Sequence, residues 1–106
     1  MPDQFDVHSK PGARNRAMPF VVIVQSNRFR ASRHRVVVPL MDAQSFRFPD
    51  SDVAPHFMVD GSEVVLDSLR ITNVPVHVLG AAIASLSEED ARIINALDTL
   101  LSRAWR

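Results

Sequence analysis

The sequence contains no cysteine among its 106 residues, so a disulfide framework and a thiolate metal site are both excluded. It has only three glycines, far apart, and therefore no glycine-rich loop that could hold a phosphate. The longest apolar runs, Phe20–Val24 and Val36–Met41, are too short to span a bilayer as a helix. The first residues also lack the pattern of a signal peptide. We therefore expect a cytoplasmic protein with no membrane partner.

Side chains that could carry chemistry are scattered along the chain. Four histidines fall on separate expected elements without metal-ligand spacing, and these are His8, His34, His56 and His77. A histidine-only metal site needs three imidazoles to converge, so we expect no metal and no other cofactor. No nucleophile, base and orienting group form a distinctive arrangement either. The residues alone give no reason to expect an enzyme or a catalytic site.

Composition is that of an ordinary globular domain, with 46% hydrophobic and 23% charged residues. One core is expected at this length, so we predict a single domain over residues 1–106. The net charge is zero but unevenly distributed. Residues 1–40 carry seven Lys or Arg and two Asp, a net of +5, whereas residues 41–106 carry five Arg and ten acids, a net of −5. This pattern is either chance with solvated loops or a basic surface for an acidic peptide or nucleic acid.

About five short β-rich segments, separated by turn residues, precede a single helix. These candidate strands cover residues 18–25, 35–40, 56–59, 63–66 and 74–79, and the weakly alternating residues 4–9 could add a first strand. Asp60-Gly61 is typical of a tight hairpin turn. Residues 42–55 are expected to be mostly loop, and residues 81–86 a connection to the helix. This order predicts a mainly β protein, an antiparallel barrel-like sheet capped by one C-terminal helix.

The last twenty residues, 87–106, have the clearest helical pattern. Apolar side chains recur there at three- and four-residue spacing, at Ile93, Ile94, Leu97, Leu100, Leu101 and Ala104. Ser87 is the expected N-cap, and the three acids that follow it suit the positive end of the helix dipole. The only tryptophan, Trp105, is the penultimate residue. Its ring either folds back on the sheet or is offered to a partner.

Two segments indicate a binding function. One is the basic loop, residues 28–35, in which Phe29 lies among arginines; the other is the tail, residues 102–106. Arginine next to an aromatic ring suits either a protein-binding hot spot or base stacking on RNA. Phe29 is either an anchor tucked under its loop, the commoner outcome, or a contact residue.

Five motifs in the correct order resemble those of the CcdB toxin family over essentially the whole chain. These motifs are Val24-Gln25-Ser26, Arg35-Val36-Val37-Val38-Pro39-Leu40, Asn73-Val74-Pro75-Val76-His77-Val78-Leu79-Gly80, Ala84-Ser85-Leu86-Ser87 and Asn95-Ala96-Leu97-Asp98. Each motif is weak alone, but their joint occurrence is specific. The chain departs from the pattern at its end, where the family's tryptophan is displaced by three positions to Trp105.

The resemblance implies an SH3-like barrel that forms a homodimer and acts as the toxin of a type II toxin–antitoxin system. Such toxins serve plasmid maintenance, bind the A subunit of DNA gyrase and trap gyrase on cleaved DNA. A CcdA-like antitoxin neutralises them, and operator DNA is bound only through the antitoxin complex. The resemblance implies that gyrase is contacted by Phe29, Asp98, Leu101, Ser102, Arg103, Ala104 and Trp105.

Two other functions stay open on the sequence. A MazF-like toxin that cleaves RNA would use the basic loop, with His34 or an arginine as acid, base or phosphate clamp. Alternatively, a diverged homologue without toxicity would keep only its antitoxin binding.

Overall fold

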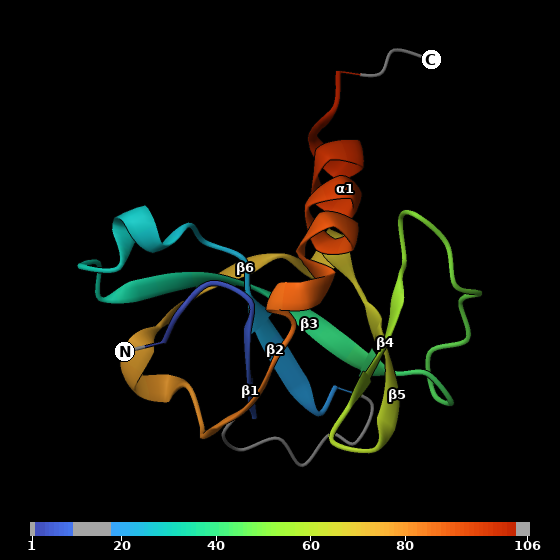
Figure 1. The fold of residues 1–106 in the computed structure, drawn as a ribbon, viewed down its shortest axis with the longest axis horizontal. Helices are drawn as coiled ribbons and strands as arrows, with labels where there is room; N and C mark the ends of the chain where they lie inside the picture. The colour runs from blue at the N-terminus through green and yellow to red at the C-terminus, as the bar shows by residue number, and fades with distance from the viewer. Residues whose placement is uncertain (1, 10–17, 104–106) are drawn as a thin grey trace.

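The computed structural model describes residues 2–9 and 18–103, which contain seven β-strands, four short 3₁₀ turns and one α-helix (Figure 1). The strands are β1 (Asp6–Ser9), β2 (Phe20–Ile23), β3 (His34–Asp42), β4 (His56–Val59), β5 (Ser62–Leu66), β6 (Thr72–Pro75) and β7 (Ala82–Ser85). The 3₁₀ turns are η1 (Asn27–Phe29), η2 (Ser68–Arg70), η3 (Val76–Val78) and η4 (Ser87–Glu89), and the helix is α1 (Asp90–Leu101).

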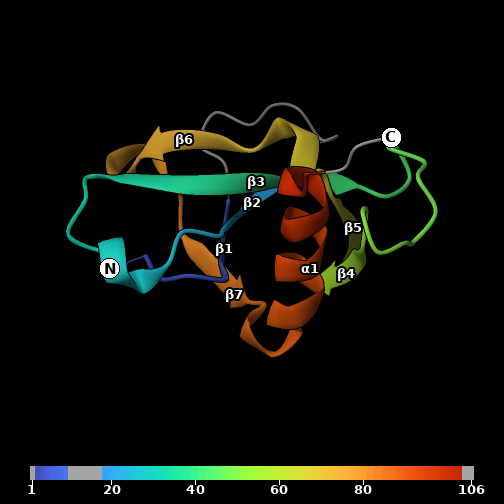
Figure 2. The ribbon, with the colours of Figure 1, turned by 90° about the horizontal axis from the view of Figure 1, so that it is seen from above.

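The strands form one antiparallel sheet in the order β4-β5-β3-β2-β1-β7, with β6 also paired to β3. Strand β3 is the longest and organises the sheet. Its first half pairs with β6 and its last residues pair with β5, while β2 lies along its other edge. The sheet curls into a half-barrel, as Figure 2 shows from above. The predicted fold class, a mainly β, SH3-like antiparallel barrel with one C-terminal helix, is confirmed.

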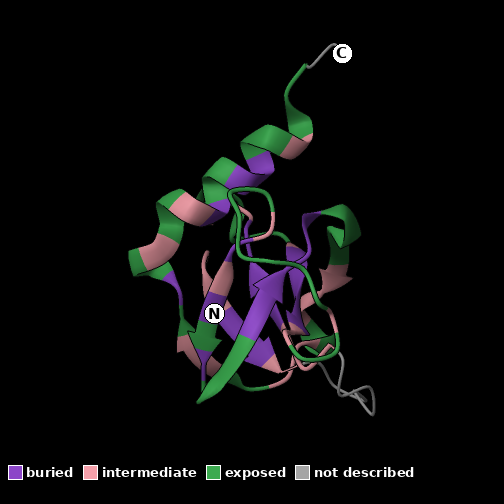
Figure 3. Cartoon of the chain, turned by 90° about the vertical axis from the view of Figure 1, so that its right-hand side faces the viewer, coloured by how far each residue is buried: buried purple, intermediate pink, exposed green. Residues whose placement is uncertain are grey.

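Helix α1 covers the concave side of the curled sheet and completes the main core. Its buried side chains, Ile93, Ala96 and Leu97, pack against strand residues of alternating pattern, such as Val38 and Leu66 (Figure 3). Full burial of one such aliphatic side chain stabilises the fold by about 2 kcal/mol. The buried stripe is narrower than the sequence predicted, because Leu101 projects into solvent and Ile94 is partly exposed.

Two strand predictions need correction. Residues 82–85, expected to be a connection, form β7 and pair with β1 through Val7 and Ala84. Residues 76–79, expected to extend a strand, instead contain η3. The partner strand β3 begins at His34, which pairs with Pro75, so the chain beyond Pro75 has no β3 residue left to pair with.

Both ends of the predicted helix also need correction. Ser87 is not the N-cap, because residues 87–89 form η4 and α1 begins only at Asp90. The helix ends at Leu101, and Ser102 adopts an extended conformation while its hydroxyl donates to the Thr99 carbonyl at 3.1 Å. Residues 104–106, which the sequence pattern had included, lie outside the described residues.

Candidate functional site

The C-terminal end of α1 presents a small exposed surface that contains four of the seven expected contact residues. Asp98, Leu101, Ser102 and Arg103 are all exposed, and 76% of Leu101 is accessible to solvent. This helix end projects away from the sheet (Figure 1). An apolar side chain exposed among polar neighbours gains free energy when a partner covers it. The two other tail residues, Ala104 and Trp105, lie outside the described residues.

The loop after β2 presents Phe29 to solvent, with 58% of the residue exposed. Of the two possibilities left open for Phe29, the buried anchor is therefore wrong. Backbone geometry supports this exposure, because Ser26 Oγ accepts from the Arg28 N–H at 3.1 Å and the Ser32 N–H donates to the Phe29 carbonyl at 3.0 Å. The turn is held by main-chain hydrogen bonds and by the Ser26 side chain, and the aromatic ring of Phe29 is left exposed.

Arg35, expected to be part of the exposed basic loop, is instead buried, with 2% of its surface exposed. Its guanidinium donates to four main-chain carbonyls, those of Pro2 (3.1 Å), Arg30 (2.9 Å), Ser32 (2.6 Å) and His34 (2.9 Å). These bonds tie the N-terminal segment and the loop of Phe29 to β3. The sequence could not show this, since arginine is seldom fully buried without a paired acid.

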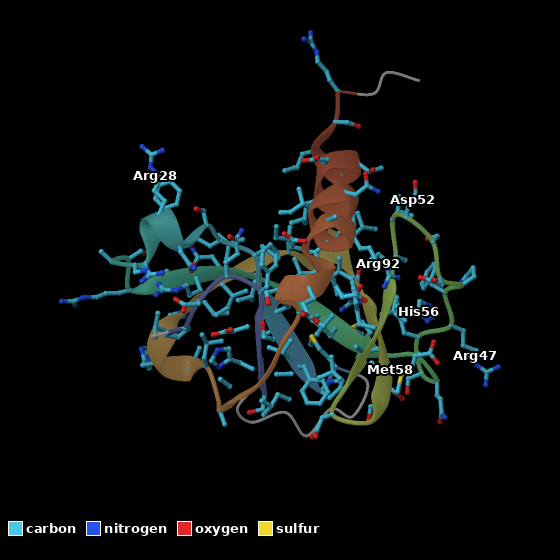
Figure 4. All side chains as sticks on the ribbon, viewed as in Figure 1. Arg28, Arg47, Asp52, His56, Met58 and Arg92 are labelled. Carbon is cyan, nitrogen blue, oxygen red and sulfur yellow. The ribbon has the colours of Figure 1, made fainter. Side chains whose placement is uncertain are left out.

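The two expected contact surfaces are separate within one chain. Figures 1 and 2 place η1 at one end of the molecule and α1 on the other side of its centre, and Figure 4 shows Arg28 on the η1 side. A single target site that includes both Phe29 and the helix end therefore requires a partner large enough to span them, or two copies of the chain.

The RNA-cleaving alternative receives little support from the geometry of the basic loop. Among the described residues, the imidazole of His34 makes no hydrogen bond to a carboxylate or to another base. The guanidinium of Arg35 is hydrogen-bonded to main-chain carbonyls. The exposed arginines of the basic loop are therefore Arg28, Arg30 and Arg33.

A third feature, missed by the sequence reasoning, is an apolar cavity of about 280 Å³. It lies between the loop of residues 43–55, η2 and the C-terminal half of α1. The rings of Phe46 and Phe48, 4.5 Å apart, form one wall, although Phe48 is 52% exposed. The only sign in the sequence was a pair of phenylalanines within an otherwise polar loop.

The same loop is fastened by a group of charged side chains centred on His56 (Figure 4). Both ring nitrogens have acceptors at 2.6 Å: Glu63 Oε2 at Nδ1 and the Phe48 carbonyl at Nε2. Asp50 accepts from the His56 main-chain N–H at 2.9 Å and pairs with Arg92 of α1 at 3.1 Å. Arg92 also pairs with Glu89 and lies over the Phe57 ring.

A protein-family model described as CcdB protein matches residues 4–102. The chain belongs to the CcdB family. It is therefore a toxin of the toxin–antitoxin class, as the resemblance implied. No match was found among curated proteins. The family match ends at residue 102, so Ala104 and Trp105 fall beyond it as well as beyond the described residues.

Two further findings on this CcdB-family protein concern metal sites and membrane-spanning helices. Within residues 2–9 and 18–103, no group of three His, Cys, Asp or Glu side chains is arranged to bind a metal ion. No helix in this part of the chain combines the length and the apolar character needed to cross a membrane.

The His56 contacts predict a pH-dependent stability of this CcdB-family protein. The hydrogen bond to Glu63, with smaller help from the Phe48 carbonyl and Asp50, raises the pKa of His56 above its usual 6.5, although partial burial opposes this. Because the folded-state pKa exceeds that of the unfolded chain, the stabilisation is complete below pH 6.5 and is lost as the pH rises through the folded-state value.

We expect His56→Ala to lower the free energy of unfolding by about 1 kcal/mol at pH 5.5 and by less at pH 8.5. The effect at pH 5.5 is no larger because Glu63 is more than half exposed, and solvent screens its interaction with His56. Urea unfolding at both pH values measures the difference. His34→Ala removes an exposed histidine and is the control, and it should change the free energy of unfolding by less than about 0.5 kcal/mol. An equal loss from His56→Ala at both pH values would contradict the assignment.

Proposed function

We propose that this CcdB-family protein is a gyrase-directed toxin. As a homodimer of one-domain chains, it binds the A subunit of DNA gyrase and traps the complex of gyrase with cleaved DNA. It acts by binding and catalyses no reaction. The match to the CcdB family over residues 4–102 carries this proposal. The exposed helix end and the exposed Phe29 are consistent with a surface built for a protein target.

The proposed contacts with gyrase are Asp98, Leu101, Ser102, Arg103, Ala104 and Trp105, with Phe29 on the second surface. Leu101 supplies apolar area at the helix end. An indole ring at Trp105 stacks well on a flat guanidinium, because the cation is attracted to the ring face. A two-fold toxin dimer presents each surface twice, which matches the symmetry of a dimeric target. This arrangement would allow two separate surfaces to act together.

A CcdA-like antitoxin with a disordered acidic segment is the proposed neutralising partner. Arg28 and Arg33 are exposed and form no ion pair among the described residues, so they remain available to acidic side chains. Electrostatic attraction of this kind speeds association with a disordered chain. We propose that operator DNA is bound only through this complex, and that the pair serves plasmid maintenance in the cytoplasm.

In the deciding experiment, the purified full chain is incubated with gyrase, ATP and supercoiled plasmid. Detergent and protease are then added to release any cleaved DNA from gyrase. We expect linear DNA to accumulate in proportion to the toxin. Gyrase without toxin is the control. Absence of both linear DNA and gyrase binding would overturn the proposal.

A parallel incubation with total RNA tests the MazF-like alternative. We expect the RNA to stay intact, and fragmentation would assign the chain to the RNA-cleaving class instead.

Expression without the antitoxin should stop growth, whereas normal growth would indicate a homologue that only binds antitoxin.

A further inference from the structure

Both nitrogens of the His56 ring face oxygen atoms that accept hydrogen bonds. Nδ1 lies 2.6 Å from the Glu63 carboxylate on β5, and Nε2 lies 2.6 Å from the main-chain carbonyl oxygen of Phe48. A neutral imidazole carries one N–H and can donate to only one of these acceptors, whereas an imidazolium donates to both. The geometry around His56 is therefore that of the protonated ring.

The cation next to this ring, Arg92 of α1, is neutralised by two other carboxylates. Asp50 of the loop accepts from Arg92 at 3.1 Å, and Glu89 of η4 accepts from the other terminal nitrogen of Arg92 at 3.0 Å. A neighbouring cation opposes protonation of a histidine, but here its charge is matched within its own ion pairs.

Glu63 is the counter-charge of the His56 ring itself. The other charged side chains of the loop, Arg47 and Asp52, are exposed and point away from the ring in Figure 4. The hydrogen bond to Glu63 is the main reason that the pKa of His56 lies above its usual 6.5, and partial burial opposes it. The ring therefore stays charged to a higher pH than a free histidine does.

The segment of residues 43–49 joins two points that do not depend on the charge of this ring. At its start, two main-chain N–H groups donate to the carbonyl of Asp42 at 2.8 and 3.1 Å. Just after its end, the carboxylate of Asp50 is held by α1 and by the first main-chain N–H of β4. Between these points, the Phe48 carbonyl accepts from the His56 ring. Loss of that bond frees the middle of the segment and leaves both ends attached.

Glu63 determines which hydrogen bond the His56 ring gives up when it loses a proton. A carboxylate carries a full negative charge and is a stronger acceptor than a carbonyl, so the remaining proton stays on Nδ1. Nε2 then directs a lone pair at the Phe48 carbonyl oxygen, and the two repel each other.

We propose that His56 is a proton-dependent switch, whose charged ring holds residues 43–49 in place and whose neutral ring releases the Phe48 carbonyl. The rings of Phe46 and Phe48 line the apolar cavity beside α1, so this release opens one wall of that cavity. Because the contacts favour the charged ring, the segment is held at low pH and is released as the pH rises through the folded-state pKa. The switch does not depend on the proposed function.

NMR spectroscopy of the full chain at pH 5.5 and 8.5 tests the switch. We expect the carbonyl resonance of Phe48 to titrate with the same midpoint as the His56 ring. The Phe46 and Phe48 main-chain N–H groups should exchange with solvent several-fold faster at pH 8.5, after correction for the intrinsic pH dependence of exchange. The main-chain N–H of His56, which is bonded to Asp50, should keep its protection. Circular dichroism checks the fold at both pH values.

Glu63→Gln tests the direction in which the proton moves. A side-chain amide can donate to a neutral Nδ1, so the single ring proton then lies on Nε2 and remains bonded to the Phe48 carbonyl. We expect this variant to hold the segment at both pH values. Glu88→Gln, at an exposed glutamate, is the matched control and should behave as the unchanged chain does.

Three results would overturn the proposal. One is a Phe48 carbonyl resonance that does not follow the His56 titration, which would show that Glu63 turns into solvent instead. Another is release of the segment at pH 8.5 in folded Glu63→Gln. The third is loss of protection at the His56 main-chain N–H together with the segment, which would show general unfolding. None of these measurements involves gyrase, so the switch and the proposed function can fail separately.

Discussion

Deletion of Trp105 and Arg106 is expected to abolish growth inhibition and gyrase binding while the protein stays folded. Helix α1 ends at Leu101 and its buried side chains stop at Leu97, so the deletion removes nothing from the described core. Loss of an aromatic hot-spot residue typically costs about 2–4 kcal/mol, or about 30- to 1,000-fold in affinity. Growth after induced expression and surface-bound gyrase binding measure the two effects.

Removal of Arg106 alone is the matched control for this deletion. It shortens the chain but keeps the indole, so most of the toxicity should persist. Circular dichroism and size-exclusion chromatography must show the same fold and assembly for all three chains. Undiminished growth inhibition without Trp105 would exclude the tail from the mechanism and leave the target contacts to Phe29 and the end of α1.

Arg35→Met is expected to lower the free energy of unfolding by about 3 kcal/mol, because four carbonyls lose a charged donor. For a domain of this size, the corresponding drop in Tm is about 10–20 °C. Thermal and urea unfolding give both values. Arg33→Met is the control, since Arg33 is exposed and a surface change of this kind alters stability by less than about 0.5 kcal/mol. Equal losses in the two variants would contradict the role of Arg35.

Much of the fold could be predicted because its determinants are local. Alternating or continuous apolar residues indicated β2, β3 and the β4–β5 hairpin, and the helical spacing of Ile93 and Leu97 indicated α1. Strand β7 escaped prediction because Ala82–Ser85 is rich in small residues and is selected as a strand by pairing with β1, which is distant in sequence. The start of α1 was misplaced since the preferred capping residue, Ser87, lies in a 3₁₀ turn.

Less of the candidate site could be predicted, because it depends on tertiary contacts. The burial of Arg35 arises from carbonyls of the N-terminal segment and a loop, which carry no side-chain pattern. His56 and Glu63 come together only through the register of the β4–β5 hairpin. The exposure of Phe29 follows from a turn held by main-chain hydrogen bonds and by the Ser26 hydroxyl. The family motifs indicated the class of toxin, and the membership is confirmed by the match over residues 4–102.

The hydrogen bonds from Arg35 to main-chain carbonyls have a consequence for which nearby positions can change in sequence. The guanidinium holds residues 30, 32 and 34 by atoms that every amino acid possesses, and the side chains of Arg30, Ser32 and His34 play no part in these bonds. Ser32 also contributes its hydroxyl, which accepts from the His34 main-chain N–H at 3.1 Å, so only positions 30 and 34 can mutate without removing a hydrogen bond of the loop that presents Phe29. The chemistry of the surface around Phe29 can therefore change at positions 30 and 34 while the hydrogen bonds of Arg35 keep the main chain in place.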